Sequence, residues 1–255
     1  MIVALTREPA ATLGRCELTF REREAIDVGS ARAQHRAYRD AVAACGARVV
    51  ALAAIDELPD SVFVEDTTIV LDELAILTRP GVESRRPEIA AIEAEVKRLR
   101  PVARVAAPAS LEGGDVLRVG RTLFVGLSPR TNREGVAALR GLAAPEGYEV
   151  VEVATSGCLH LKTACTALDE ETILANPDWI EAEVFEGREV VPVPRGEPWA
   201  ANVLALGRSV CVSAAHPATA ELLAGRGFDV RALDVSEFTK AEAGVTCMSL
   251  LFREV

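Results

Sequence analysis

The sequence predicts a single α/β domain over residues 1–255, folded as a five-bladed α/β propeller with pseudo-fivefold ββαβ units. Three observations lead to this prediction. Two apolar runs, a helical pattern and a third apolar run return in the same order along the chain. The two ends of the chain each hold only part of one such unit. A hydrophobic content of 49 % is ample for a packed core.

The first complete unit begins near residue 62. Two apolar runs flank a polar turn and predict a β-hairpin. Apolar residues then recur at helical spacing between Pro87, which suits a helix start, and Pro101, which stops the helix. A short apolar run closes the unit as a strand. The predicted elements are strands at 62–71 and 74–78, a helix at 87–99 and a strand at 102–106.

Three further units repeat this order. In the second, Thr131 and Glu134 form the capping box expected at a helix start. In the third, only a short helix is expected after Pro177, and His160 precedes its first strand. The fourth has a helix that begins near Pro217. These three units cover residues 115–153, 161–193 and 202–233.

The fifth unit is divided between the two ends of the chain. The N-terminal part supplies a strand at 2–6, a helix at 30–45 and a strand at 47–52, while the last hairpin is at 245–252. A closed ring of blades explains this division, because closure leaves no unpaired strand edge at the ends. An ordinary α/β sandwich is the alternative fold.

Charge and composition narrow the function. The net charge of −10 disfavours a nucleic-acid partner, because a phosphate backbone would be repelled, whereas a small cationic substrate suits that sign. No leader segment and no apolar run of membrane-spanning length is present, so we expect a cytoplasmic protein without a membrane partner. The six cysteines lack CxxC or zinc-site spacing and are expected to stay reduced.

Four polar segments interrupt the apolar pattern at the same place in their blades, at the entry to the first strand of a hairpin. Equivalent positions in a ring converge on its axis, so a carboxylate, His160 and Cys247 are expected to meet there. A carboxylate, an imidazole and a thiol in contact supply an orienter, a base and a nucleophile. The four segments are 59–67, 111–115, 157–162 and 245–249.

Each of these features also has a structural interpretation. A core histidine with satisfied hydrogen bonds is the alternative for His160, and His35 and His216 are interpreted as structural or solvated. Glu65 and Asp66 could cap or pair on the surface. Adjacent strand residues face opposite sides, so these two share a pocket only where the strand is irregular. Burying both carboxylates calls for a cation or hydrogen-bond donors.

At these segments the sequence closely resembles the dimethylarginine dimethylaminohydrolases, members of the guanidino-group-modifying (pentein) superfamily of five-bladed α/β propellers. The resemblance spans the whole chain. Its marks, in order, are Pro59-Asp60-Ser61-Val62-Phe63-Val64-Glu65-Asp66, Leu111-Glu112-Gly113-Gly114-Asp115, Leu159-His160-Leu161-Lys162 and Thr246-Cys247-Met248-Ser249-Leu250.

The resemblance implies a role for each matching residue. Cys247 would be the nucleophile, His160 the general acid and base, and Glu112 the carboxylate that supports His160. Asp66, with Glu65 beside it, would hold the guanidinium nitrogens. Asp60, Arg85 and Arg130 would hold the amino-acid head of the substrate. Leu18, in the polar segment 14–29, would be a lid residue that closes over the substrate, and Ala241 would contact the substrate through its backbone carbonyl. The implied substrate-binding residues are Leu18, Asp60, Phe63, Glu65, Asp66, Arg85, Arg130 and Ala241.

The implied reaction is hydrolysis of Nω,Nω-dimethyl-L-arginine, or of Nω-methyl-L-arginine, to L-citrulline and dimethylamine or methylamine through a covalent thiouronium on Cys247. No metal or organic cofactor takes part, although a soft metal such as zinc could occupy Cys247 and His160 as an inhibitor. The expected partner is a small cationic amino acid, and the protein is expected to be a monomer or homodimer.

Three alternatives remain open. The first is a deiminase or hydrolase of another guanidine such as arginine or agmatine; Glu65 argues against it, because arginine deiminases resemble a pattern with arginine at that place. The second is a non-catalytic propeller that binds a partner, which predicts no cluster of cysteine, histidine and glutamate. The third is a cysteine peptidase, which needs a glycine-rich context that Thr246-Cys247-Met248 lacks.

Overall fold

The computed structural model describes residues 1–253, and their strands form five three-stranded sheets. This arrangement confirms the predicted five-bladed α/β propeller. The sheet orders are β15-β1-β2, β3-β4-β5, β6-β7-β8, β9-β10-β11 and β12-β13-β14. The strands are β1 (Ile2–Arg7), β2 (Ala47–Leu52), β3 (Thr68–Val70), β4 (Ala75–Leu77), β5 (Val102–Arg104), β6 (Val116–Val119), β7 (Thr122–Leu127), β8 (Glu149–Ala154), β9 (Cys165–Ala167), β10 (Thr172–Ala175), β11 (Glu189–Pro192), β12 (Leu204–Leu206), β13 (Ser209–Ser213), β14 (Asp229–Leu233) and β15 (Leu250–Arg253).

All five sheets share one connectivity. The first two strands of each are antiparallel, and the second and third are parallel. A parallel connection needs a crossover segment, which a helix supplies in most of the blades. In the divided blade, β1 pairs antiparallel with β15 and parallel with β2, as predicted. The α-helices are α1 (Val28–Ala44), α2 (Pro87–Leu99), α3 (Arg133–Ala143), α4 (Leu161–Ala164), α5 (Pro217–Gly225) and α6 (Ser236–Thr239).

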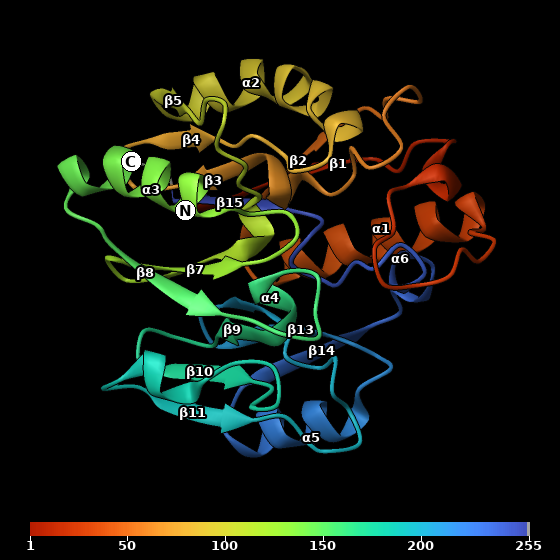
Figure 1. The fold of residues 1–255 in the computed structure, drawn as a ribbon. Helices are drawn as coiled ribbons and strands as arrows, with labels where there is room; N and C mark the ends of the chain where they lie inside the picture. Colours follow the sequence, from red (N-terminus) through yellow and green to blue (C-terminus); the bar gives the residue numbers. More distant parts are fainter. Residues whose placement is uncertain (254–255) are drawn as a thin grey trace.

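The hydrophobic core lies between the blades. Five clusters of buried apolar residues occur, and each one joins a blade to the next. One cluster joins Phe252 and Leu5 to Leu77 and Ile92, and another joins Tyr38 of α1 to β12 and β13. Helices α2 and α5 lie on opposite outer sides of the molecule with the sheets between them (Figure 1). Packing at every blade interface therefore holds the ring closed.

Local sequence signals explain where the regular elements begin and end. Helix α2 has the predicted bounds, with Pro87 at its first position and Ile89, Ile92 and Val96 buried. The predicted N-cap of α3 is wrong: the side chain of Asn132 caps it by accepting from Gly135 N at 2.8 Å. The hydroxyl of the predicted cap, Thr131, instead accepts from Glu112 N at 3.2 Å.

Two predicted strands begin later than expected, because the chain turns sharply before it enters the sheet. The 3₁₀ helix η2 (Val64–Thr67) replaces the first part of the run at 62–71. Residues 161–164, expected in a strand, form the short helix α4, with His160 at its N-cap position but without a side-chain cap hydrogen bond, and β9 starts only at Cys165. The short helix expected after Pro177 is the 3₁₀ helix η6 (Ala182–Phe185), and the last hairpin supplies a single strand from residue 250.

The innermost strands of the blades enclose a channel of about 710 Å³ around the axis of the ring, lined in part by Glu65, Lys162 and Thr246. The polar segments that precede these strands gather at one end of it. Among residues 1–253 no helix has both the length and the apolar character needed to cross a membrane.

Candidate active site

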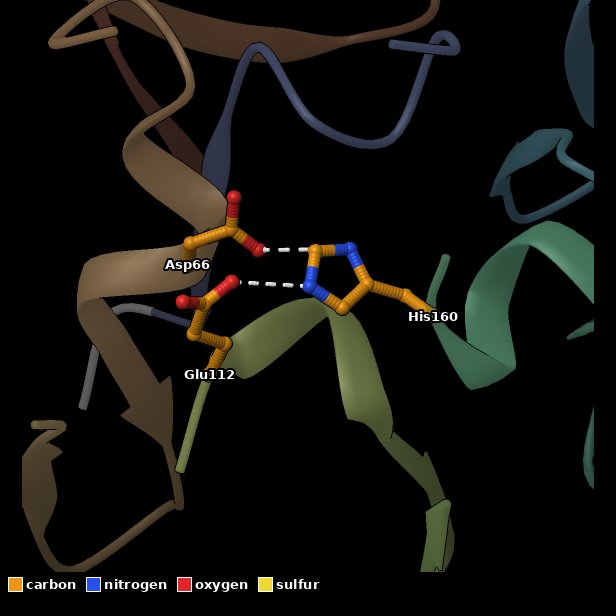
Figure 2. A group of neighbouring side chains, drawn as sticks. All are labelled: Asp66, Glu112 and His160. Atoms are coloured by element: carbon orange, nitrogen blue, oxygen red, sulfur yellow. Dashed lines mark hydrogen bonds and ion pairs between the residues drawn. The ribbon is translucent and has the colours of Figure 1, made fainter. Parts of the chain in front are cut away.

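An imidazole that faces two neighbouring carboxylates forms the centre of the site (Figure 2). His160 Nε2 lies 2.8 Å from Glu112 Oε2, and His160 Nδ1 lies 3.9 Å from Asp66 Oδ1. All three side chains are buried, and Glu112 is 0 % exposed. They come from the entries to three successive blades, as the equivalence of blade positions predicts.

The charge states of this group follow from its surroundings. Burial lowers the pKa of His160, but the carboxylates of Asp66, Asp115 and Glu112 outweigh burial and raise it to about 9. Burial raises the pKa of Asp66, but His160 and Arg85 outweigh it and lower that pKa to about 2. The site without substrate thus holds an imidazolium at neutral pH.

Two glycines allow the three segments to approach. A Cβ on Gly114 would stand 2.6 Å from His160 Nδ1 and 2.7 Å from Asp66 Oδ1, and a Cβ on Gly113 would stand 2.0 Å from the carbonyl oxygen of Glu65. Such distances are shorter than side-chain carbons tolerate. Gly114 N also donates to Asp66 Oδ1 at 3.0 Å. The Gly-Gly pair is therefore a requirement of the close approach.

Asp115 positions the turn that carries His160, a role that the sequence did not single out. Its carboxylate accepts from Leu161 N at 3.0 Å and from the Ser128 hydroxyl at 2.6 Å. It ends the motif that contains Glu112, so its place at the same blade entry was the available signal. Buried carboxylates with such partners fix the backbone that they bind.

Two buried arginines offset the negative charge. Arg85 Nη1 lies 2.7 Å from Asp66 Oδ2, and its Nε and Nη2 donate to Glu88 at 3.0 and 2.9 Å. Burial raises the pKa of Glu88 to about 7 despite that contact. Arg130 Nη1 lies 3.6 Å from Glu112 Oε1. The two predicted head-group arginines are thus both tied to the carboxylates of the imidazole cluster.

Cys247 is half-buried, and its thiol lies within reach of the charges of Glu65 and Asp66. Its carbonyl accepts from Glu65 N at 3.2 Å, and its Sγ accepts from Gly244 N at 3.4 Å. Burial, followed by the negative charges of Glu65 and Asp66, raises the pKa of this thiol to about 12. Without a cationic ligand Cys247 is therefore a neutral thiol.

A network of polar side chains holds Thr246, the residue that precedes Cys247. Glu65 accepts from Lys162 Nζ at 2.6 Å and from the Thr246 hydroxyl at 2.7 Å. The Asn202 amide clamps the same threonine, because its Nδ2 donates to Oγ1 at 2.9 Å and its Oδ1 accepts from Thr246 N at 3.1 Å. Sequence reasoning missed Asn202 as a site residue, although it opens the fourth blade at the equivalent position.

The polar segment 14–29, which was expected to hold a lid residue, contacts two of the predicted site residues, Asp60 and Arg130. The part of it at residues 16–27 is called the lid below. Asp60 accepts from Glu17 N at 3.2 Å, and burial raises the pKa of Asp60 to about 6. Leu18 and Cys247 pack against the apolar cluster that includes Phe63 and Ala241. The structure thus places the predicted site residues in this apolar group and in the polar group around His160, and the two are linked at Phe63, whose carbonyl accepts from Arg85 Nη2 at 3.4 Å. The predicted site residues are Leu18, Asp60, Phe63, Glu65, Asp66, Arg85, Glu112, Arg130, His160, Ala241 and Cys247.

The cluster also contains a set of possible metal ligands. Ligand atoms of Asp66, Glu112 and His160 lie within 4.8 Å of one another. Arg85 and Arg130 already supply positive charge to the two carboxylates. These charges disfavour a resident cation.

Comparison with known proteins identifies relatives along the whole chain. Residues 32–193 match the family model described as arginine deiminase. The N(G),N(G)-dimethylarginine dimethylaminohydrolase of Streptomyces coelicolor is 42 % identical over 99 % of this chain and 97 % of its own. The protein of the same name from Pseudomonas aeruginosa is 37 % identical over 89 % of this chain and 90 % of its own.

Solved structures agree with the sequence relatives. A cysteine-to-serine mutant of the Pseudomonas aeruginosa DDAH, complexed with citrulline, superposes with a TM-score of 0.94 at 35 % identity and covers 98 % of both chains. A dimethylarginine dimethylaminohydrolase adduct with S-methyl-L-thiocitrulline has the same TM-score and identity and covers 99 % of this chain and 100 % of that chain.

Proposed function

This chain belongs to the arginine deiminase family and, within it, to the dimethylarginine dimethylaminohydrolases, and from this membership we propose that it hydrolyses Nω,Nω-dimethyl-L-arginine and Nω-methyl-L-arginine to L-citrulline and the methylated amine. It is a hydrolase that acts on C–N bonds. The observation that carries the proposal is the buried His160–Glu112 pair, 2.8 Å apart, together with Asp66, which lies near His160 and whose charge also acts on the thiol of Cys247. This arrangement provides an acid, its orienter and a nucleophile.

The substrate would bind with its charge matched at both ends. Asp66 and Glu65 would hold the guanidinium so that its central carbon faces the sulfur of Cys247. The α-amino group of the amino-acid head would meet Asp60, and its carboxylate would meet Arg130, whose forked donors suit a carboxylate. Arg85, whose donors are held by Asp66 and Glu88, would contribute its positive charge beside the head. The side chain of Leu18 would cover the bound molecule, Phe63 would pack along it, and the carbonyl of Ala241 would accept from the α-amino group.

The first half of the reaction would form the covalent intermediate. The bound guanidinium cation lowers the pKa of the Cys247 thiol, which releases its proton to solvent. The thiolate attacks the guanidinium carbon, and a C–S bond forms. The imidazolium of His160 gives its proton to the methylated nitrogen, the C–N bond breaks, and the neutral amine leaves. A thiouronium remains on the sulfur, and His160 is neutral.

The second half would consume one water molecule. Neutral His160 takes a proton from water, and the resulting hydroxide attacks the thiouronium carbon. The C–S bond then breaks as the added hydroxyl gives its proton to the departing sulfur, citrulline leaves, and Cys247 is a thiol again. The imidazole is protonated once more, with Glu112 stabilising that charge. The proton that His160 gives in the first half is thus recovered in the second.

Product formation tests the proposal directly. We expect citrulline and dimethylamine in equal amounts from dimethylarginine with the wild type, and a rate at least about 10³-fold lower with Cys247→Ser. Free arginine is the control substrate and should be turned over more slowly. Equal rates on arginine would indicate a general guanidine hydrolase, and a wild type inactive on dimethylarginine would contradict the substrate assignment.

A further inference from the structure

The carboxylate of Glu242 binds the lid, although the two are far apart in the sequence. Its Oε2 accepts from Thr19 N at 2.9 Å, and its Oε1 accepts from Phe20 N at 2.6 Å and Arg21 N at 2.5 Å. Three consecutive backbone amides thus point at one anion, an arrangement that proteins use to bind anions tightly. In this case the anion is a side chain of the same protein.

The backbone at Glu242 is in an unusual conformation. Its φ is 59°, and among residues 1–253 it is the one non-glycine residue with a positive φ. It follows the short helix α6, where a left-handed residue is common but is usually glycine, because other side chains are strained there. A glutamate at a position where glycine fits better points to a use for its side chain. The residue before it is Ala241.

The other contacts of the lid end on proposed substrate-binding residues. Asp60 accepts from Glu17 N, and Arg130 Nη2 donates to the Thr19 hydroxyl at 2.9 Å. Thr19 is also the first amide that Glu242 holds. Leu18 stands between these contacts, in the apolar cluster that contains Cys247. The same few residues of the lid therefore connect Asp60 and Arg130, the two proposed head-group residues, to Glu242.

We propose that Glu242 is a positioning residue that clasps the lid over the active site and couples lid closure to recognition of the substrate's amino-acid head. The inference rests on the proposed function, which assigns the neighbouring carbonyl of Ala241 to the α-amino group. One turn of chain then carries both the contact to the substrate and the contact to the lid. Opening the clasp frees Thr19 and, with it, the Arg130 guanidinium.

Two variants separate the clasp from the backbone strain. Glu242→Gln keeps the shape of the side chain but loses one accepting oxygen, and Glu242→Gly removes the clasp while suiting the positive φ, so that misfolding does not explain its effect. The matched control is Glu22→Gln, which makes the same change of charge at an exposed position of the same lid. Thermal unfolding of all variants verifies that they fold.

Each variant is compared with the wild type in two measurements. The first is KM and kcat for dimethylarginine. The second is the rate of trypsin cleavage after Arg21 and Arg23, both exposed in the lid, followed by mass spectrometry with and without citrulline. We expect Glu242→Gly to raise KM about 10-fold with kcat changed by less than about 3-fold, and to speed cleavage about 10-fold. Glu242→Gln should lie between it and the wild type.

The outcomes discriminate the clasp from the proposed function. Wild-type KM and cleavage rate in Glu242→Gly, or the same changes in Glu22→Gln, would overturn the clasp. A wild type that does not hydrolyse dimethylarginine would contradict the proposed function instead. In that case the cleavage rates alone still decide whether Glu242 holds the lid.

Discussion

The two halves of the active site differ in how completely the protein assembles them before substrate arrives. In the imidazole half, both oxygens of Glu112 are hydrogen-bonded, to Gly81 N at 3.0 Å and to His160, and the histidine is already charged. In the thiol half, Cys247 receives one weak hydrogen bond and keeps its proton, with a pKa of about 12. The comparison teaches that the proposed acid is charged before substrate binds, whereas the proposed nucleophile needs a cation in order to ionise.

Removing the charge of Glu112 disrupts the His160–Glu112 pair and has the largest expected effect on activity. Glu112→Gln should lower kcat by about 10²- to 10³-fold, because the imidazolium loses its charge-assisted hydrogen bond. The pH profile should shift as well: the pKa of His160 falls, so activity declines at a lower pH on the alkaline side.

The matched control for this variant is Glu88→Gln, since Glu88 is equally buried but contacts Arg85 instead of His160. It should leave the alkaline limb of the profile in place. An unchanged alkaline limb in Glu112→Gln would contradict the assignment of that limb to His160.

The charge of His160 should also appear in the stability of the protein. Its folded pKa of about 9 lies above the unfolded value of about 6.5. Protonation therefore stabilises the folded state fully below pH 6.5, and this contribution is lost as pH rises through 9, by on the order of 3 kcal/mol. Urea unfolding of the wild type and His160→Gln measures it. A difference between the two that stays constant from pH 6 to pH 10 would contradict the raised pKa.

The rate at which Cys247 is alkylated tests whether its thiol is neutral in the absence of substrate. At pH 8 and without substrate, we expect iodoacetamide to modify this cysteine at least about 10-fold more slowly than free cysteine, because the thiolate is the reactive form. The rate should still be rising at pH 10. Peptide mapping against Cys247→Ser assigns the modified residue, and a plateau below pH 9 would show that the thiol ionises without a cation.

Weakening the support beneath Cys247 has the smallest expected effect. Asn202→Ala removes both contacts to Thr246 and should lower kcat/KM roughly 10-fold, because the cysteine is then held less firmly. Asn176→Ala is the control, since Asn176 is another buried asparagine and donates to the carbonyl of Pro198 at 3.0 Å. Equal losses of kcat/KM in the two folded variants would remove the special role of Asn202.

The regular parts of the fold could be predicted because local signals mark them. Pro87 and Pro101 set the bounds of α2, and the apolar spacing between them sets its buried face. The segment before β3 could not be predicted in the same way. Val62-Phe63-Val64 has the composition of a strand, but packing at the ring axis turns the following carboxylates into a 3₁₀ helix.

The same distinction holds for the site. His160 and Cys247 could be singled out because each stands at a blade entry, a position that the repeat defines. Glu242 has no such mark, since its partners in the lid lie more than 200 residues earlier in the chain. Arg85 was expected at the head group, but only the structure shows its contacts with Asp66 and Glu88. Contacts that depend on the closed ring leave no local pattern.

The pairing of β1 with β15 has a consequence for the order in which the protein is made. A ribosome delivers β1 long before its antiparallel partner, residues 250–253. Until those residues are made, the inner edge of β1 stays open, which favours protection by a chaperone. Cys247 emerges only just ahead of that closing strand. A nascent chain thus lacks the proposed nucleophile until the ring is ready to close around it.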